Sequence, residues 1–333
     1  MKKRSWASGW GVAVLVLVGL VVFPVAGAPV WILSLAGQIM ALALFALSFD
    51  LLFGYTGVVS FGHAAFWGIG GYAIAIASRA GGGAAGILLL GAVAGIVLAA
   101  ALGVVEGLIL SRVKAGYFAM VTLAISQILL LMASSQNLRP YTGGSDGLNV
   151  YLPRFLLSGP AIYYLLLAVL VLSFVVLYRL VRSPAGLVWR GMRENESRIE
   201  SMGHDVLAYK VAVNVVSGMF AAVAGMLYML VIQIATPELF GLSNSLSALL
   251  MVIIGGAGTL VGPVVGAVIL VLAEHELSSI GSNVPFLSHW LILFGLMFIL
   301  IVMVAPRGLM GALDKLRARA AARTTGTVTG HRS

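Results

Sequence analysis

The sequence has 333 residues, of which 61% are hydrophobic and 9% charged, and its formal net charge is +9. This composition excludes an ordinary soluble globular domain and predicts an integral membrane protein. The absence of cysteine excludes a disulfide framework, a thiolate metal site and a cysteine nucleophile. The basic residues are scattered between apolar runs rather than gathered in a patch, so we expect no nucleic-acid partner.

Apolar runs near or above the ~20 residues of a bilayer-spanning helix predict an all-α bundle of about eight transmembrane helices. They cover 9–29, 31–53, 58–78, 86–111, 116–134, 160–181, 207–233 and 286–304. A further run, 245–273, is interrupted by GGAGTLVGP. We expect there a re-entrant pair or two short tilted helices of roughly twelve to fifteen residues each. The total is then about 8 to 10 membrane segments.

The positions of Lys and Arg predict the side of the membrane that each loop occupies. If the amino terminus is cytoplasmic and the 245–273 pair returns to the side it left, 17 of the 20 basic residues face the cytoplasm, as the positive-inside rule requires. The three outer ones are Arg79, Arg139 and Arg154. Both termini are then cytoplasmic. The start of the chain also resembles a cleavable signal, but an uncleaved first helix is favoured.

Residues 1–310 are predicted to form the transmembrane domain, and 311–333 a basic, disordered cytoplasmic tail. Two polar stretches interrupt the membrane part. The stretch 135–159 is rich in turn-forming residues and is predicted on the outer side. The second stretch, 182–206, lies on the cytoplasmic side and is named here the coupling segment.

Within the coupling segment, apolar residues recur at helical spacing and form a narrow stripe: Met192, Ile199 and Met202. Opposite charges four residues apart, Arg190 with Glu194 and Glu194 with Arg198, would each contribute only ~0.3–0.5 kcal/mol. These features predict one short amphipathic helix that ends near Gly203 and has no core of its own. Its mixed charge argues against a helix lying on lipid, so we expect a docking surface for a cytoplasmic partner.

The sequence contains no phosphate-binding GxxxxGK[ST] loop, no HExxH or GxSxG motif, and no cluster of metal-ligating residues. We therefore expect neither an enzyme nor a metal site. Asp50 and Glu106 are the acidic residues inside the long apolar runs. The simplest interpretation is that Asp50 accepts hydrogen bonds from nearby backbone and that Glu106 pairs with Arg112 or Lys114.

Several motifs then occur in one order: GYTGVVSFGHAAFWGIGGYA, TGGSDGL, RENESRIESMGHDVLAYK followed by AAVAGMLY, MVIIGGAGTLVGPVVGA and APRGL. In this order they resemble the bacterial branched-chain amino acid ABC transporter permeases, specifically the longer of the two permease partners. The resemblance runs from about Leu42 to Leu309. One departure is Asp50, where the family often has asparagine. The family also includes permeases for urea and short amides, and no residue here separates these substrates from amino acids.

The resemblance implies an importer of five subunits in the inner membrane: two permeases, often different chains, two cytoplasmic ATPases and a periplasmic substrate-binding protein. ATP and Mg²⁺ would be bound by the ATPases, and this chain would hold no cofactor. The part of the coupling segment that meets the ATPase would comprise Arg190, Met192, Arg193, Glu194, Glu196, Arg198, Ile199, Glu200, Met202 and Gly203. The outer loop facing the binding protein would include Thr142, Gly143, Gly144 and Asp146.

The glycine-rich stretch after Asp50 is expected to face the interior of the bundle, because lipid cannot satisfy irregular backbone. Its candidates for the translocation path or gate are Tyr55, Ser60, Phe61 and His63, with structural packing as an equal alternative for each. The expected mechanism is alternating access driven by the ATPases. A secondary carrier or a channel that works without ATPases is the rival class.

Overall fold

The computed structural model describes residues 19–24, 27, 29–113, 115–153, 156, 159–281 and 308–311. Within these ranges, five helices are long and apolar enough to cross a membrane. They are α2 (Val30–Thr56), α4 (Ala85–Arg112), α5 (Ala115–Ser134), α7 (Gly159–Val181) and α10 (Val206–Ile232). The predicted helical membrane bundle is therefore confirmed. The predicted 8 to 10 segments are not, since 9–29 and 286–304 lie wholly or mostly outside the described residues.

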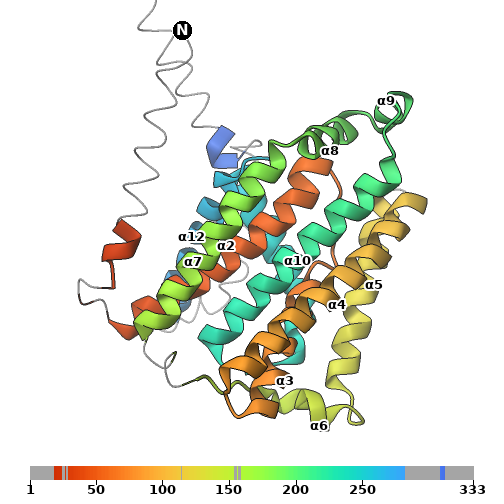
Figure 1. Cartoon of the computed structure of the whole chain (residues 1–333). Coiled ribbons are helices and arrows are strands. Elements are labelled where there is room, and N and C mark those ends of the chain that lie inside the picture. The colour runs from red at the N-terminus through yellow and green to blue at the C-terminus, as the bar shows by residue number, and fades with distance from the viewer. Residues whose placement is uncertain are drawn as a thin grey trace, which may run out of the picture.

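Helix α10 lies in the middle of the bundle and packs against α2, α4 and α3 (Ala64–Gly81) (Figure 1). Its contact with α4 depends on small residues. A Cβ added at Gly103 would lie 2.7 Å from Val215 Cα, and one at Gly107 would lie 2.6 Å from Val211 Cα. Because a side chain at either position would force the backbones apart, these glycines set the close α4–α10 packing.

Helix α2 ends at Gly57, whose left-handed backbone (φ 77°) allows its N–H to donate to Phe53 O at 3.0 Å. The chain then runs without helix to His63, the N-cap residue that precedes α3. The predicted run 58–78 is thus represented by a helix that starts six residues later. Gly57 itself is exposed, but the irregular residues that follow it are buried or partly buried, as expected for a glycine-rich segment at membrane depth.

The 245–273 run is broken where its glycines predict. Helix α11 (Leu242–Gly255) and helix α12 (Val261–Gly281) flank the break, in which Gly256 and Gly258 have positive φ. The two helices touch backbone to backbone, since a Cβ added at Gly266 would overlap Met251 O. The second arm, with 21 residues, is longer than the predicted twelve to fifteen.

The polar elements gather at two opposite ends of the bundle (Figure 1). One end carries α6 (Arg139–Thr142), the short turn η1 (Gly144–Asp146), and strand β1 (Leu148–Asn149), which pairs antiparallel with β2 (Ile234–Ala235). The turn η3 (Pro237–Phe240) follows β2. The other end carries α8 (Pro184–Glu194) and α9 (Glu196–Ser201). This separation agrees with the predicted placement of the two polar stretches on opposite sides of a membrane.

Candidate functional site

The coupling segment forms two helices rather than the single predicted helix. Asn195 has an extended backbone (φ −161°, ψ 104°) that ends α8, and its Oδ1 accepts the N–H of Arg198 at 3.0 Å to begin α9. Asparagine is a poor residue for a helix interior and a strong N-cap, which explains the break. Gly203 lies just beyond α9 with φ 85°, so the predicted end of the segment is close to the observed one.

The apolar stripe is buried within this chain, contrary to our expectation that it has no core. Met192 and Ile199 are each only 8% exposed, and they join a hydrophobic cluster with Trp189 and the carboxyl-terminal half of α2. The charged residues between the apolar ones led to the prediction of a solvated helix, whereas α8 and α9 pack against the bundle. The third member of the stripe, Met202, is 66% exposed, as is Leu187 at 62%.

Neither predicted ion pair forms within the described coupling segment, because each of the three residues involved either contacts another group or stays exposed to solvent. The guanidinium of Arg190 lies over the ring of Tyr55, 5.1 Å from its centroid. Glu194 and Arg198 are both exposed to solvent. Surface pairs of this kind contribute little, so their absence does not destabilise α8 and α9.

The neighbouring residue Arg193 connects the coupling segment to the glycine-rich stretch. Its guanidinium donates to the carbonyl oxygen of Gly54, in the last turn of α2. Its stem covers Gly57, where an added Cβ would lie 3.1 Å from Arg193 Cγ. A Cβ added at Gly258, in the α11–α12 break, would lie 3.3 Å from the guanidinium nitrogen. Three segments that are distant in sequence therefore meet at one arginine.

Asp50 completes this junction from inside the bundle. The residue is fully buried, and its Oδ1 accepts the N–H of Gly258 at 2.8 Å. A Cβ added at Gly54 would overlap both Asp50 Oδ1 and Gly258 N. The expected role of Asp50 as a backbone acceptor is thus observed, although the donor belongs to the α11–α12 break rather than to its own segment. We call Asp50, Gly54, Arg193 and Gly258 the glycine junction.

The four predicted path residues lie close to the junction but inside packed protein. Tyr55, Ser60 and His63 are buried and Phe61 is partly buried. His63 Nε2 is 2.9 Å from Ser48 Oγ. Its ring is surrounded by aromatic neighbours at centroid distances of 5.3 to 5.6 Å: Phe45, Phe49 and Phe66. Their role in a path or gate remains a prediction.

Glu106 does not form the predicted pair with Arg112. Both of its carboxyl oxygens are buried and have no hydrogen-bond partner among the described residues. The residue lies in α4 next to Gly107, at the level where Gly103 and Gly107 pack closely against α10. Lys114, the alternative partner, lies outside the described residues.

The predicted outer motif forms a compact turn at the opposite end. Gly143 and Gly144 both have positive φ, which accounts for glycine at these positions. Thr142 Oγ1 donates to Ala133 O at 2.8 Å and accepts the N–H of Gly144 at 3.2 Å. Asp146 is exposed and pairs with Arg139 at 2.5 Å. We had overlooked the exposed rings beside this turn, Tyr141 and Tyr151, because tyrosine gives no sequence signal of docking.

Fold and site together define a polytopic helical membrane protein with a broken helix pair and a polar segment anchored in one end of the bundle. Residues 31–302 match the family described as branched-chain amino acid transport system / permease component. This match covers most of the sequence, so the chain belongs to that family of permease components.

Curated relatives agree with this assignment. The chain is 26% identical over 306 residues to the high-affinity branched-chain amino acid transport system permease protein LivM of Salmonella typhimurium, covering 83% of this chain and 69% of the relative. The Escherichia coli protein of the same name gives the same identity and coverage. A probable LivM permease of Methanocaldococcus jannaschii is 27% identical over 307 residues, covering 79% and 88%. No solved structure matches the chain.

Proposed function

We propose that this chain is a membrane-spanning permease subunit of an ATP-binding cassette importer for branched-chain or related amino acids. It makes no covalent bond with its substrate, and separate ATPase subunits supply the energy and bind ATP and Mg²⁺. Family membership and the names of the LivM relatives support the transport role. The coupling through an ATPase rests on the geometry of the coupling segment.

The observation that carries the proposal is the contact between Arg193 and Gly54. It joins an exposed segment at one end of the bundle to the last turn of α2, a membrane-spanning helix, and, through Gly258, to the break between α11 and α12. A push on α8 would therefore reach α2 and the α11–α12 break directly. A channel or an independent carrier has no need of such a connection.

The exposed side of the coupling segment supplies the docking surface. Leu187 and Met202 present large apolar side chains to solvent, and exposed charged residues such as Arg190 and Glu200 lie close to them in the sequence. Apolar anchors with a polar rim are typical of protein interfaces. We assign this side to the cytoplasm and to the ATPase.

In the proposed cycle, closure of two ATPases moves α8 and α9, and the glycine junction transmits the movement to α2 and the broken pair. These helices tilt and expose a central path alternately to the two sides. A substrate-binding protein delivers the amino acid to the opposite end, where Tyr141, Asp146 and Tyr151 are exposed. A second permease completes the membrane unit, whose place is the bacterial inner membrane.

Co-purification tests the docking surface. The double variant Leu187→Glu and Met202→Glu should no longer retain the ATPase, because it places charge on both apolar anchors. Tyr141→Glu is the matched control, since Tyr141 is equally exposed, at 67%, on the opposite end. Loss of the ATPase in the control, or its retention in the double variant, contradicts the proposal.

Uptake into proteoliposomes tests the energy source and the substrate. With the assembled subunits, uptake of labelled leucine should require ATP hydrolysis and should not be reduced by excess urea. Uptake without ATPase subunits would instead indicate a carrier or channel, and uptake of urea would indicate the amide branch of the family.

A further inference from the structure

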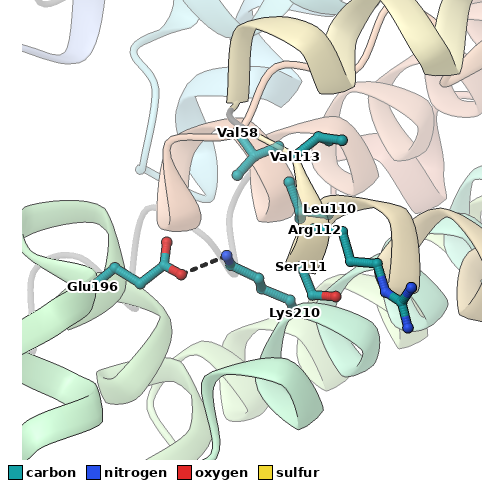
Figure 2. Close-up of a pocket in the computed structure, with 7 residues that line it drawn as sticks. All are labelled: Val58, Leu110, Ser111, Arg112, Val113, Glu196 and Lys210. Atoms are coloured by element: carbon teal, nitrogen blue, oxygen red, sulfur yellow. Dashed lines mark hydrogen bonds and ion pairs between the residues drawn. The ribbon is translucent and has the colours of Figure 1, made fainter.

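A cavity of about 440 Å³ lies where the ends of α4 and α10 meet α9, at the same end of the bundle as α8 (Figure 2). Small-molecule sites usually have volumes of about 300–1,000 Å³, so its size is suitable for a metabolite. It is lined by Val58, Leu110, Ser111, Arg112, Val113, Glu196 and Lys210. The path and outer-loop candidates of the sequence lie elsewhere, and we had given Lys210 no role.

Three charged residues line the cavity: Lys210, Glu196 and Arg112. Lys210 Nζ donates to Glu196 Oε1 at 2.5 Å, and the side chains are 10% and 51% exposed. An ammonium group has three N–H donors, and Glu196 is its hydrogen-bond partner among the described residues. Lys210 can therefore donate to a second carboxylate, and Glu196 can accept from a second ammonium, without breaking the pair.

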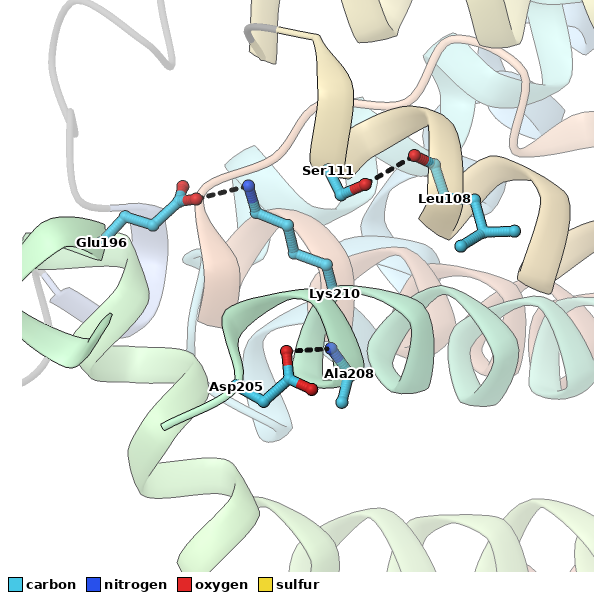
Figure 3. Close-up of polar contacts among 6 residues, drawn as sticks. All are labelled: Leu108, Ser111, Glu196, Asp205, Ala208 and Lys210. Atoms are coloured by element: carbon cyan, nitrogen blue, oxygen red, sulfur yellow. Dashed lines mark hydrogen bonds and ion pairs between the residues drawn. The ribbon is translucent and has the colours of Figure 1, made fainter. Parts of the chain in front are cut away.

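Neighbouring polar groups do not compete for these positions (Figure 3). Asp205 is used as the N-cap of α10, where its Oδ1 accepts the N–H of Ala208 at 3.2 Å. Ser111 Oγ donates to Leu108 O at 2.7 Å. The guanidinium of Arg112 points away from the Lys210–Glu196 pair in Figure 2. The Lys210–Glu196 pair thus presents one charge of each sign, as a zwitterionic ligand requires.

The remaining wall is aliphatic. Val58, Leu110 and Val113 come from the α2–α3 connection and the end of α4, and Val58 and Leu110 are buried. Placing a branched apolar side chain against these groups would be favourable, because the free energy gained by hydrophobic burial is proportional to the apolar area removed from water.

We propose that this cavity binds a zwitterionic amino acid with an apolar side chain on the side where transported substrate is released. The α-carboxylate accepts hydrogen bonds from Lys210, the α-ammonium donates to Glu196, and the side chain packs against Val58, Leu110 and Val113. The choice of ligand rests on the proposed function and narrows it, since urea and short amides carry neither charge. Because Glu196 belongs to α9, occupation of the site connects the amino acid to the coupling segment.

Equilibrium binding of radiolabelled L-leucine tests the site, using the full chain with its co-purifying subunits in lipid nanodiscs, without binding protein or ATP. Leucine should bind saturably and be displaced by isoleucine. Three truncated probes should each compete roughly 10-fold or more weakly: 4-methylpentanoate, which lacks the ammonium, isoamylamine, which lacks the carboxylate, and glycine, which lacks the side chain. Absence of saturable binding, or competition by any of the three probes as strong as that of unlabelled leucine, would overturn the proposal.

Two variants assign the charges. Glu196→Gln should weaken leucine binding roughly 10- to 100-fold and leave competition by 4-methylpentanoate unchanged. Lys210→Met should weaken leucine and 4-methylpentanoate and leave isoamylamine unchanged. Asp205→Asn is the control, because asparagine preserves the N-cap while removing the adjacent charge, and it should bind leucine normally.

Leucine binding that both Glu196→Gln and Lys210→Met leave intact would place the amino acid elsewhere and overturn the site. The same result would follow if Asp205→Asn weakened binding as much as they do. Because binding is measured without ATP, this failure is separate from loss of ATPase co-purification, which tests the proposed function.

Discussion

The two polar ends of the bundle are built differently. At the α6–β1 end, backbone pairing of β1 with β2 and the turn around Gly143 and Gly144 hold the chain, and the Arg139–Asp146 ion pair is exposed. At the α8–α9 end, side chains of the coupling segment enter the bundle: Trp189, Met192 and Ile199 are buried. We call the first end the cap; it also buries Leu148 and Phe240 in the core, so the second end differs by Arg193, which contacts α2 and the α11–α12 break.

The glycine junction accounts for the difference. Only a residue without a side chain fits at position 54, where Asp50 and the backbone of Gly258 approach. The exposed ion pair of the cap can be removed without disturbing the helices beneath it, whereas α8 cannot move without α2 and the α11–α12 break. The two ends should therefore respond very differently to substitution.

The largest effect is expected for Gly54→Ala. The new methyl group would overlap Asp50 Oδ1 and Gly258 N, so α2 and the α11–α12 break must separate. Overpacking of this kind costs about 1–3 kcal/mol, and we expect a lower melting temperature together with loss of uptake. Thermal unfolding in detergent and uptake into proteoliposomes are the measurements.

Gly86→Ala is the matched control for Gly54→Ala. It lies in α4, and nothing lies within 4 Å of an added Cβ. Since alanine favours helix over glycine by about 1 kcal/mol, this variant should be as stable as the parent or more so. Equal losses in the two variants would show that the junction has no special role.

An intermediate effect is expected at His63, which lies between the two ends. His63→Ala should destabilise the protein by about 2 kcal/mol, the lower end of the range for large-to-small changes in a packed core. His63→Leu fills the same space and should keep uptake within about threefold, since Ser48 Oγ also donates to Phe45 O at 2.6 Å.

Comparison of these two His63 variants separates packing from a role in the path. If His63→Leu abolishes uptake while the melting temperature stays high, His63 contacts the substrate or the gate. The aromatic side chains packed around the ring favour a packing role, and therefore retained uptake in His63→Leu.

The smallest effect is expected for Arg139→Ala in the cap. Its partner Asp146 is 72% exposed, and exposed ion pairs contribute about 0.2–1 kcal/mol. The melting temperature should change little and uptake not at all. A loss of uptake with normal stability would instead place Arg139 in the interface with a substrate-binding protein.

The sequence predicted the elements that depend on composition. Long apolar runs identified α2, α4, α5, α7 and α10, and the glycines of GGAGTLVGP identified the α11–α12 break. It failed where a single residue redirects the chain or where contacts are distant. Asn195 divides the segment that the spacing of charges predicted as one helix. The burial of Met192 and Ile199 depends on contacts with α2, which lies more than a hundred residues earlier in the sequence. The contact between Arg193 and Gly54 has no local sequence signal.

Arg193→Ala gives the most direct test of the central claim that the coupling segment acts on the bundle through the glycine junction. The ATPase should still co-purify and hydrolyse ATP, because Leu187 and Met202 are unchanged, while leucine uptake falls roughly 10- to 100-fold through loss of a charged hydrogen bond. Arg198→Ala, on the exposed side of α9, should leave uptake unchanged. Normal uptake in Arg193→Ala, or equal loss of uptake in both variants, would contradict the account.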